Sequence, residues 1–219
     1  MKIGRREATL RREIIDVGLR AFSAGLVTEI EGNISARLGT DRVLVSPHRL
    51  PYEDRIPGDI VLLDLEGRII RRSREPTSES RMHLAIYRAR EDVGAIIHAH
   101  PVYSSAMSVA SEPIRPILDE VIPFAGGTIE VVPFAPSGSS ELAEAAVRTL
   151  GKKSAVLVAN HGTLCVGRDL DHAYRMTKQV EKWAQINVLA KLLGRAETIP
   201  IGRQNQQLRD YESAKTPIW

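Results

Sequence analysis

Apolar residues recur along this chain with two different spacings, and these spacings predict which segments form helices and which form strands. Between residues 8 and 24 the apolar positions fall three to four residues apart, which is typical of an amphipathic helix that Gly25 can end. Runs rich in β-branched residues, such as 93–97, are instead typical of buried strands. The expected helices span 8–24, 78–90, 104–110, 139–150 and 169–193. The expected strands span 33–38, 42–46, 59–64, 68–71, 93–100, 128–132, 154–158 and 163–166.

Strands cluster early in this order and alternate with helices later, which favours a sheet covered by helices. We therefore expect an α/β fold in which the central sheet is mostly antiparallel. Because the sequence has no internal repeat, low-complexity linker or abrupt change of composition, residues 1–219 are expected to form a single domain. The segment 203–219 is polar up to Pro217-Ile218-Trp219, and we expect a tail that either packs on a neighbouring surface or stays mobile.

The composition, with 43% hydrophobic and 26% charged residues, is that of an ordinary globular protein. The net charge is only +3, and the arginines are interspersed with acids, so we expect no nucleic-acid partner. The charged N-terminus lacks the apolar core of a signal peptide, and no stretch approaches the roughly 18 apolar residues of a membrane span. We therefore expect a cytoplasmic protein with no membrane partner. The single cysteine, Cys165, excludes an internal disulfide, and its apolar surroundings predict a small buried side chain.

Two histidines flank one alanine at the end of the apolar run 93–97. Because strand side chains alternate between the two faces of a sheet, His98 and His100 are expected to lie on the same side. Neutral imidazole suits zinc, so the pair can form half of a metal site, and the alternative is two histidines that bind nothing. His161 follows another predicted strand, where Gly162 is expected to let the chain bend, and it is the candidate third ligand.

Glu79 lies where a predicted helix begins, and two interpretations of it remain open. With Ser78 as the N-cap, an acid in the first turn is stabilised by the helix dipole. Alternatively, its carboxylate lies beside the metal as a general base. His83, one turn further along, is expected to be a core residue. The pair Gly32-Asn33 offers backbone N–H groups and a side-chain amide that can hold an anion.

Together these motifs resemble the class II aldolase and adducin-head superfamily, and within it the L-fuculose-1-phosphate aldolases. The resemblance follows the family's order along about residues 10–195. The segments that carry it are 31–37 (Glu-Gly-Asn-Ile-Ser-Ala-Arg), 76–79 (Pro-Thr-Ser-Glu) with His83, 87–101 ending in His-Ala-His-Pro, 125–127 (Ala-Gly-Gly), and 160–162 (Asn-His-Gly) with Gly167 and Glu181.

The resemblance implies a three-layer α/β/α fold that assembles as a homotetramer, with active sites between subunits. It also implies a divalent cofactor, either Zn²⁺ or another ion such as Mn²⁺ or Co²⁺, and a small-molecule sugar phosphate as substrate. The implied site residues are His98, His100 and His161 for the metal, Glu79 as the catalytic base, and Asn33, Thr77 and Ser78 for the substrate phosphate.

The reaction that the resemblance implies is cleavage of a ketose 1-phosphate, similar to L-fuculose 1-phosphate, into dihydroxyacetone phosphate and an aldehyde through a metal-stabilised enediolate. A decarboxylase of a β-keto acid or phosphoacid needs the same stabilisation and remains an alternative. A pentulose-phosphate 4-epimerase is less favoured, because those relatives carry Asp where Glu79 stands. A non-catalytic adducin-like domain is disfavoured by the presence of all three histidines and the glutamate.

Three departures from the aldolase pattern concern the implied substrate site. Ile30 stands where the aldolases carry Thr or Ser, and His48-Arg49 stands where they carry Thr-Gly. When the chains are aligned on Ala-Gly-Gly, the tyrosine that a neighbouring subunit supplies in the aldolases falls on Glu120. Arg49 either binds a phosphate or carboxylate through two hydrogen bonds or blocks the original pocket.

Overall fold

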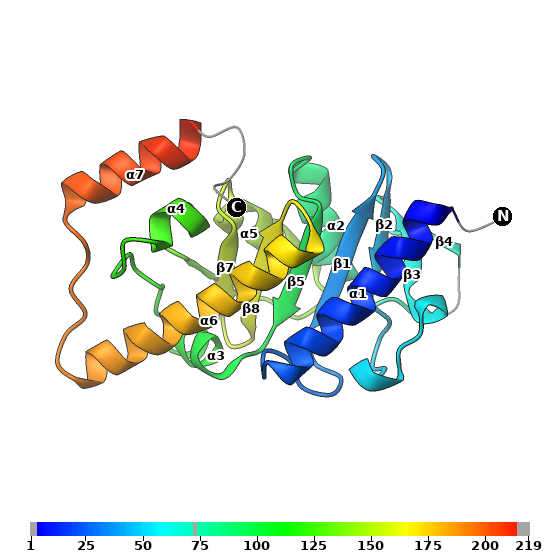
Figure 1. The fold of residues 1–219 in the computed structure, drawn as a ribbon, viewed down its shortest axis with the longest axis horizontal. Helices are drawn as coiled ribbons and strands as arrows, with labels where there is room; N and C mark the ends of the chain where they lie inside the picture. The colour runs from blue at the N-terminus through cyan, green and yellow to red at the C-terminus, as the bar shows by residue number, and fades with distance from the viewer. Residues whose placement is uncertain (1–3, 72–73, 214–219) are drawn as a thin grey trace.

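The computed structural model describes residues 4–71 and 74–213, and its helices flank a central sheet (Figure 1). The strands are β1 (Asn33–Leu38), β2 (Arg42–Val45), β3 (Val61–Asp64), β4 (Ile69–Arg71), β5 (Ala95–Ala99), β6 (Val131–Val132), β7 (Ala155–Val158) and β8 (Gly162–Gly167). The α-helices are α1 (Arg5–Ser23), α2 (Ser80–Ala89), α3 (Val102–Val109), α4 (Val121–Ala125), α5 (Ser140–Leu150), α6 (Leu170–Leu192) and α7 (Ile201–Ser213). Two 3-10 helices, η1 (Tyr52–Asp54) and η2 (Pro57–Asp59), precede β3.

Within the described residues, the strands form one sheet of eight in the order β4-β3-β2-β1-β5-β8-β7-β6. Neighbouring strands run antiparallel except β6 and β7, which run parallel. This arrangement confirms the expected α/β class with a mostly antiparallel sheet. β5 lies in the middle and pairs with β1 on one side and β8 on the other, so the histidine pair at its end is central.

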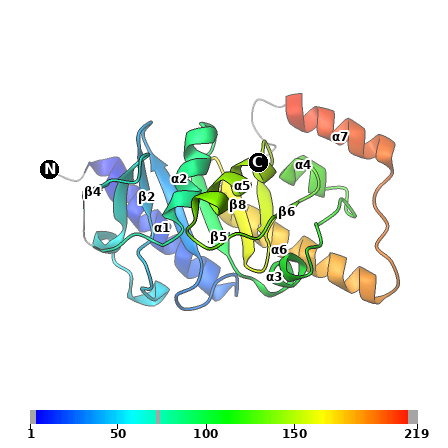
Figure 2. The same cartoon turned by 180° about the vertical axis from the view of Figure 1, so that it is seen from behind.

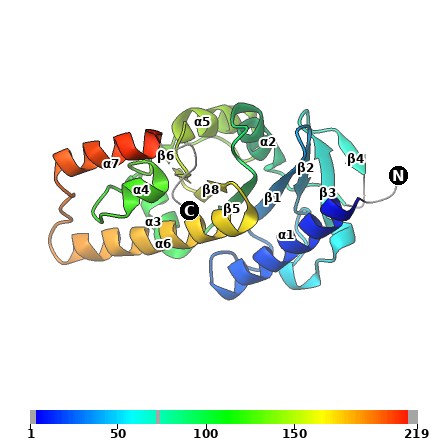
Figure 3. The ribbon, with the colours of Figure 1, turned by 45° about the horizontal axis from the view of Figure 1, so that its top comes forward.

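Helices cover both faces of the sheet, which gives the three layers that the resemblance implied. α1 and α6 lie in front of the sheet in Figure 1, whereas α2 and α5 come to the front in the reverse view of Figure 2. Figure 3 shows the sheet between these two helix layers. Alternate residues of β5 divide between the cores, since Ile96 packs with α2 and α5 and Ile97 packs with α1 and α6. In the part of the chain described, no helix is long and apolar enough to cross a membrane.

Two helices, α4 and α7, were not predicted from the apolar spacing. The expected tail is helical as far as residue 213, because its polar residues find partners just before α4, at Asp119, and just before β7, at Lys152 and Ser154. Gln207 is buried and donates a hydrogen bond of 2.7 Å to the carbonyl oxygen of Asp119. Polar side chains of this kind give no apolar period in the sequence, so the helix was missed. The apolar end Pro217-Ile218-Trp219 lies outside the described residues.

Helix α3 begins directly after the histidine pair, and a carboxylate from α6 fixes its start. Pro101, at the N-cap, has no side chain that can accept a hydrogen bond from the helix. Instead, Glu181 accepts hydrogen bonds from the backbone N–H groups of Tyr103 and Ser104, at 2.9 and 2.8 Å. Because the first N–H groups of a helix otherwise lack partners, Glu181 holds the chain segment that leaves His100.

The one cysteine, Cys165, is buried in a hydrophobic cluster between the sheet and α6, where it packs with Met176 and Val180. Burial raises the pKa of the Cys165 thiol to about 12. A thiol with such a high pKa is a poor nucleophile at neutral pH. The expectation of a small buried side chain is therefore confirmed.

Candidate functional site

His98 and His100 lie on the same side of β5, as the alternation of strand side chains predicts. His98 is fully buried on the sheet face that α2 covers, and His100 follows where the strand ends and is partly exposed. Their Nε2 atoms are 2.8 Å apart, and their rings meet edge to face with centroids 4.7 Å apart. Both ring nitrogens therefore face one common point.

His161 joins this pair from the turn between β7 and β8. Its Nε2 lies 3.3 Å from Nε2 of His98. The prediction that Gly162 makes the bend is wrong, because the left-handed backbone is at Asn160, with φ of +55°. Gly162 serves close packing instead, since a Cβ there would lie 2.3 Å from the carbonyl oxygen of Ala99.

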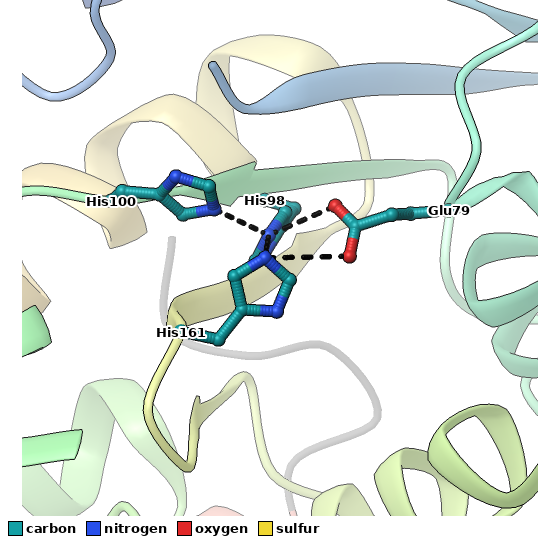
Figure 4. Close-up of side chains that lie close together, drawn as sticks. All are labelled: Glu79, His98, His100 and His161. Carbon is teal, nitrogen blue, oxygen red and sulfur yellow. Dashed lines mark hydrogen bonds and ion pairs between the residues drawn. The ribbon is translucent and has the colours of Figure 1, made fainter. Parts of the chain in front are cut away.

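Glu79 completes the cluster, as Figure 4 shows. Its Oε2 lies 3.0 Å from Nε2 of His98, and its Oε1 lies 3.5 Å from Nε2 of His161. The carboxylate also accepts hydrogen bonds from Asn33 Nδ2, at 2.8 Å, and from Ser137 Oγ, at 3.0 Å. Four donor atoms from three histidines and one glutamate thus lie within 4.8 Å of one another.

The structure overturns the interpretation of Glu79 as a first-turn acid. Helix α2 begins at Ser80, so Glu79 itself is the N-cap, and its side chain makes no capping hydrogen bond. Ser78 is consequently not the N-cap. The helix start orients Glu79 toward the histidines, so its carboxylate contacts the cluster and does not cap the helix.

Protonation in the cluster follows from burial and from the hydrogen bonds. Burial alone would raise the pKa of the Glu79 carboxyl, but the adjacent His98 and His161 outweigh this and hold that pKa well below its usual range. Burial lowers the pKa of His100 to about 3 and also lowers the pKa of His161. At neutral pH the site therefore contains an ionised Glu79 carboxylate, with His100 and His161 in their neutral form.

These residues fit a divalent metal ion. The carbonyl oxygen of Thr163 can only accept, so His98 carries its proton on Nδ1, 2.9 Å away, and directs the Nε2 lone pair at the cluster. Four contacts join the Nε2 atoms of the histidines and the two carboxylate oxygens, and they range from 2.8 to 3.5 Å. Ligands at zinc–nitrogen distances of about 2.0–2.1 Å in a tetrahedron are about 3.3 Å apart. Three imidazoles and a carboxylate are also the donor types that zinc and similar ions accept.

A cavity of about 290 Å³ opens over the cluster, and it brings together all the residues expected to hold phosphate. Gly32 is required there, because its φ is +74° and a Cβ would lie 2.7 Å from the carbonyl oxygen of His98. The Asn33 amide also lines the cavity, although one of its hydrogens is directed at Glu79. The other expected residues on the wall are Thr77, Ser78 and Arg49.

Arg49 lies on the wall of this cavity, and its backbone has a conformation that glycine adopts more easily than other residues. Its φ is +48°, in the left-handed region that disfavours most side chains. Its side chain is exposed and makes no hydrogen bond or ion pair with any residue in the described ranges. The guanidinium is therefore available to an anion that enters the cavity. Ile30 lines the same cavity and adds an apolar surface to it.

Glu120 lies outside this cavity in the same chain. It is the N-cap of α4 and lines a separate depression together with Asp119, Phe124 and Arg203. A role for Glu120 at the histidine cluster would therefore require a neighbouring subunit, as the resemblance implied for the equivalent tyrosine.

His83 is buried beside the cluster, and the expectation of a core residue is confirmed. Its Nδ1 lies 2.7 Å from Ser35 Oγ, which in turn lies 2.9 Å from the hydroxyl of Tyr87. The hydroxyl of Tyr87 can donate to Ser35 Oγ, and the hydroxyl of Ser35 can donate to Nδ1 of His83, so both hydroxyl groups donate a hydrogen bond and His83 carries its proton on Nε2. The protonated Nε2 of His83 then has no partner within the described residues.

Ser137 is the site residue that sequence reasoning missed. It lies in the loop before α5, and Gly138 packs so closely that a Cβ would lie 2.8 Å from the carbonyl oxygen of Ser78. That contact brings Ser137 to Glu79, from which it is 58 positions distant in sequence. A single serine in a proline- and glycine-containing loop gives no local signal of such a role.

Comparison with known proteins finds a matching family model and similar enzymes. Residues 12–188 match the family model described as Class II Aldolase and Adducin N-terminal domain. A 5-deoxy-D-ribulose 1-phosphate aldolase of Bacillus thuringiensis is 32% identical over 203 residues, which cover 92% of this chain and 95% of that protein. An L-fuculose phosphate aldolase of Escherichia coli is 35% identical over 178 residues, covering 81% of each.

Comparison of the fold with solved structures also finds an aldolase. The solved structure of an L-fuculose 1-phosphate aldolase superposes with a TM-score of 0.89 and is 30% identical in sequence. The superposition covers 93% of this chain and 96% of the other. The similarity therefore extends over nearly the whole length of both proteins.

The buried His83 predicts how stability depends on pH. Burial, with a smaller effect of His98, lowers the pKa of His83 to about 3, whereas an unfolded chain binds this proton near pH 6.5. Below about pH 6.5 this residue therefore destabilises the fold by about 1.4 kcal/mol for each pH unit. With a metal chelator present, urea unfolding between pH 7 and pH 5 should show the wild type losing stability faster than His83→Gln. Equal pH dependence in the two proteins would show that His83 is not held neutral. His48→Gln, at an exposed position, is the control and should follow the wild type.

Proposed function

This chain belongs to the class II aldolase and adducin family and is a metal-dependent aldehyde-lyase, and from this premise we propose that it cleaves a ketose 1-phosphate into dihydroxyacetone phosphate and an aldehyde. The observation that carries the proposal is the convergence of three imidazoles and a carboxylate beneath a cavity with anion-binding groups on its wall. The names of two relatives specify 5-deoxy-D-ribulose 1-phosphate and L-fuculose phosphate, and both guide the choice of substrates to test.

In this proposal His98, His100 and His161 hold the metal, which we take to be Zn²⁺, with Mn²⁺ and Co²⁺ as alternatives. A bound divalent ion supplies Lewis-acid stabilisation of the negative charge that develops on the substrate oxygens when the carbon–carbon bond breaks. The Nδ1–H of His98 donates to the Thr163 carbonyl and so fixes the orientation of that ring. The sheet thereby sets the geometry of the centre before any ligand binds.

Glu79 is proposed as the catalytic base. Cleavage requires a proton to leave the hydroxyl on the carbon that becomes the aldehyde, and a proton must reach the carbon that remains with the phosphate half. The Glu79 carboxylate is ionised, buried and adjacent to the three imidazoles, so it can carry a proton at this position. Asn33 and Ser137 hold it in place through one oxygen each.

The substrate phosphate is proposed to bind on the wall of the same cavity. Gly32 offers a backbone in the left-handed conformation, and Thr77 and Ser78 offer hydroxyl groups just before α2. Asn33 retains a second amide hydrogen beyond the one directed at Glu79. Arg49 adds a positive charge without an acidic partner in the described ranges, which suits a dianion.

A second candidate function is decarboxylation of a β-keto acid. Arg49, which has no acidic partner among the residues that the structure describes, favours it, because a guanidinium binds a carboxylate as readily as a phosphate. Decarboxylation also produces an enolate, which the same centre would stabilise. The two functions differ in the bond that breaks and are separated by assay.

We also propose that the protein is a homotetramer with active sites between subunits. The position of Glu120 supports this assembly, since it is remote from the cluster of its own chain and lies in an exposed depression. A neighbouring chain would complete the cavity above the metal.

Metal content and substrate use test the proposal directly. Elemental analysis of protein purified without chelator should show about one divalent ion per chain, and His98→Ala should lose it. The loaded wild type should condense dihydroxyacetone phosphate with acetaldehyde or L-lactaldehyde, the aldehydes that the two named ketose phosphates would yield. Unchanged metal content in His98→Ala would contradict the ligand assignment. Activity confined to β-keto acids in a parallel panel would establish the second candidate instead.

Glu79→Gln should lower turnover roughly 10²-fold or more, which is the usual contribution of a positioned base. The amide preserves the shape of the side chain and removes the basic oxygen. Metal content should be measured in parallel so that loss of the ion is not mistaken for loss of the base. The exposed Glu29→Gln serves as control and should retain wild-type turnover. A near-normal rate with reduced thermal stability would show that Glu79 is structural.

Arg49→Ala should raise KM for the phosphorylated substrate with little change in kcat, as expected for binding shared by ground and transition states. Arg49→Gly removes the strained φ of +48° and should be more stable than Arg49→Ala, but it should not improve substrate use. If the glycine variant gains activity with dihydroxyacetone phosphate, Arg49 is an obstruction and not an anion contact. Arg12→Ala, an exposed position on α1, is the matched control.

A further inference from the structure

The second nitrogen of each imidazole decides how firmly that ring is held. When Nε2 binds a metal, the neutral ring carries its proton on Nδ1, and this N–H is commonly fixed by a carbonyl or carboxylate. His98 has such a partner in the Thr163 carbonyl, 2.9 Å away. For His100, the acidic group beside Nδ1 is the carboxylate of Glu31, whose Oε2 lies 4.0 Å away.

Glu31 is itself held in place on the side facing His100. Thr28 Oγ donates a hydrogen bond of 2.7 Å to Oε2, the same oxygen that approaches His100. A carboxylate oxygen can accept more than one hydrogen bond, so the Thr28 contact leaves Oε2 able to accept another. The side chain is about half exposed, at 52%, and lines the cavity above the cluster.

We infer that Glu31 is a positioning residue for the metal centre: its carboxylate accepts the Nδ1–H of His100 and fixes the tautomer and angle of that ring. The inference rests on the proposed metal site. The 4.0 Å separation exceeds a direct hydrogen bond, and it is closed by rotation of the half-exposed carboxylate or by one bridging water. Thr28, Glu31 and His100 then form a chain of hydrogen bonds that leads to the metal.

This chain of hydrogen bonds also explains why the acidic Glu31 lines a cavity that is proposed to bind an anionic substrate. A carboxylate on this wall opposes phosphate binding, so its presence calls for a compensating use. A carboxylate behind a histidine raises the basicity of that ligand, and removal of such a partner typically lowers metal affinity 10- to 100-fold. His100 is the more exposed of the two β5-end histidines, and it therefore depends more on a partner of this kind.

The test measures zinc affinity by competition with a chelator, together with the visible spectrum of the Co²⁺-substituted protein. Glu31→Ala should weaken zinc binding about 10- to 100-fold and alter the Co²⁺ spectrum. Glu31→Gln should weaken it less, because the amide oxygen still accepts a hydrogen bond. Thr28→Val should weaken it to an intermediate degree without any change of charge. The neighbouring Glu29→Ala is the matched control and should match the wild type in both measurements.

Two outcomes would overturn the inference. Equal losses in Glu31→Ala and Glu31→Gln with no effect of Thr28→Val would show that Glu31 acts only through its charge. Wild-type affinity in all three variants would show that His100 needs no such partner. Failure of the proposed function is distinguishable, because in that case the wild-type protein itself would bind no zinc.

Discussion

The pairing of β5 with both β1 and β8 is the constraint on which the site depends. In this register Asn33 lies opposite His98 on one side, and the carbonyl of Thr163 receives the Nδ1–H of His98 from the other. A slip of one residue would turn His98 to the opposite face and break both contacts. The pairing also requires Gly162, since any larger residue would collide with the Ala99 carbonyl.

Burial of the cluster carries a free-energy cost that its hydrogen bonds must offset. A carboxylate and three imidazoles removed from water are unfavourable unless they are paired and hydrogen-bonded. Asn33, Ser137 and Thr163 provide part of that pairing in the chain itself. The Nε2 atoms of His98, His100 and His161 face one another, and a divalent cation bound at their common point would stabilise this arrangement.

The proposed metal end and the proposed anion end of the cavity are built from different parts of the fold. The metal end uses strand ends and the start of α2, which the hydrophobic cores on both faces hold rigidly. The proposed anion end includes the loops that carry Ile30 and Arg49, which are exposed. Loops tolerate substitution more readily than packed strands, and two of the departures from the aldolase pattern, at Ile30 and at His48-Arg49, lie on these loops. Substrate preference can therefore change while the centre stays the same.

The sequence by itself determined the strands, most helices and the common face of His98 and His100, because apolar periodicity and strand alternation are local properties. The expected helix over 169–193 also begins where α6 does, since Asp169 is the N-cap of α6 and its side chain accepts a hydrogen bond from the N–H of His172. Only the tertiary structure decided that Glu79 faces the histidines and that Ser137 supports it. His161 lies 63 positions from His98, and Ser137 lies 58 positions from Glu79. Spacing along the chain carries no information about such pairs, since strand register and loop packing bring them together. Helix α7 was missed for the same reason, because its buried contacts are polar and depend on a distant surface.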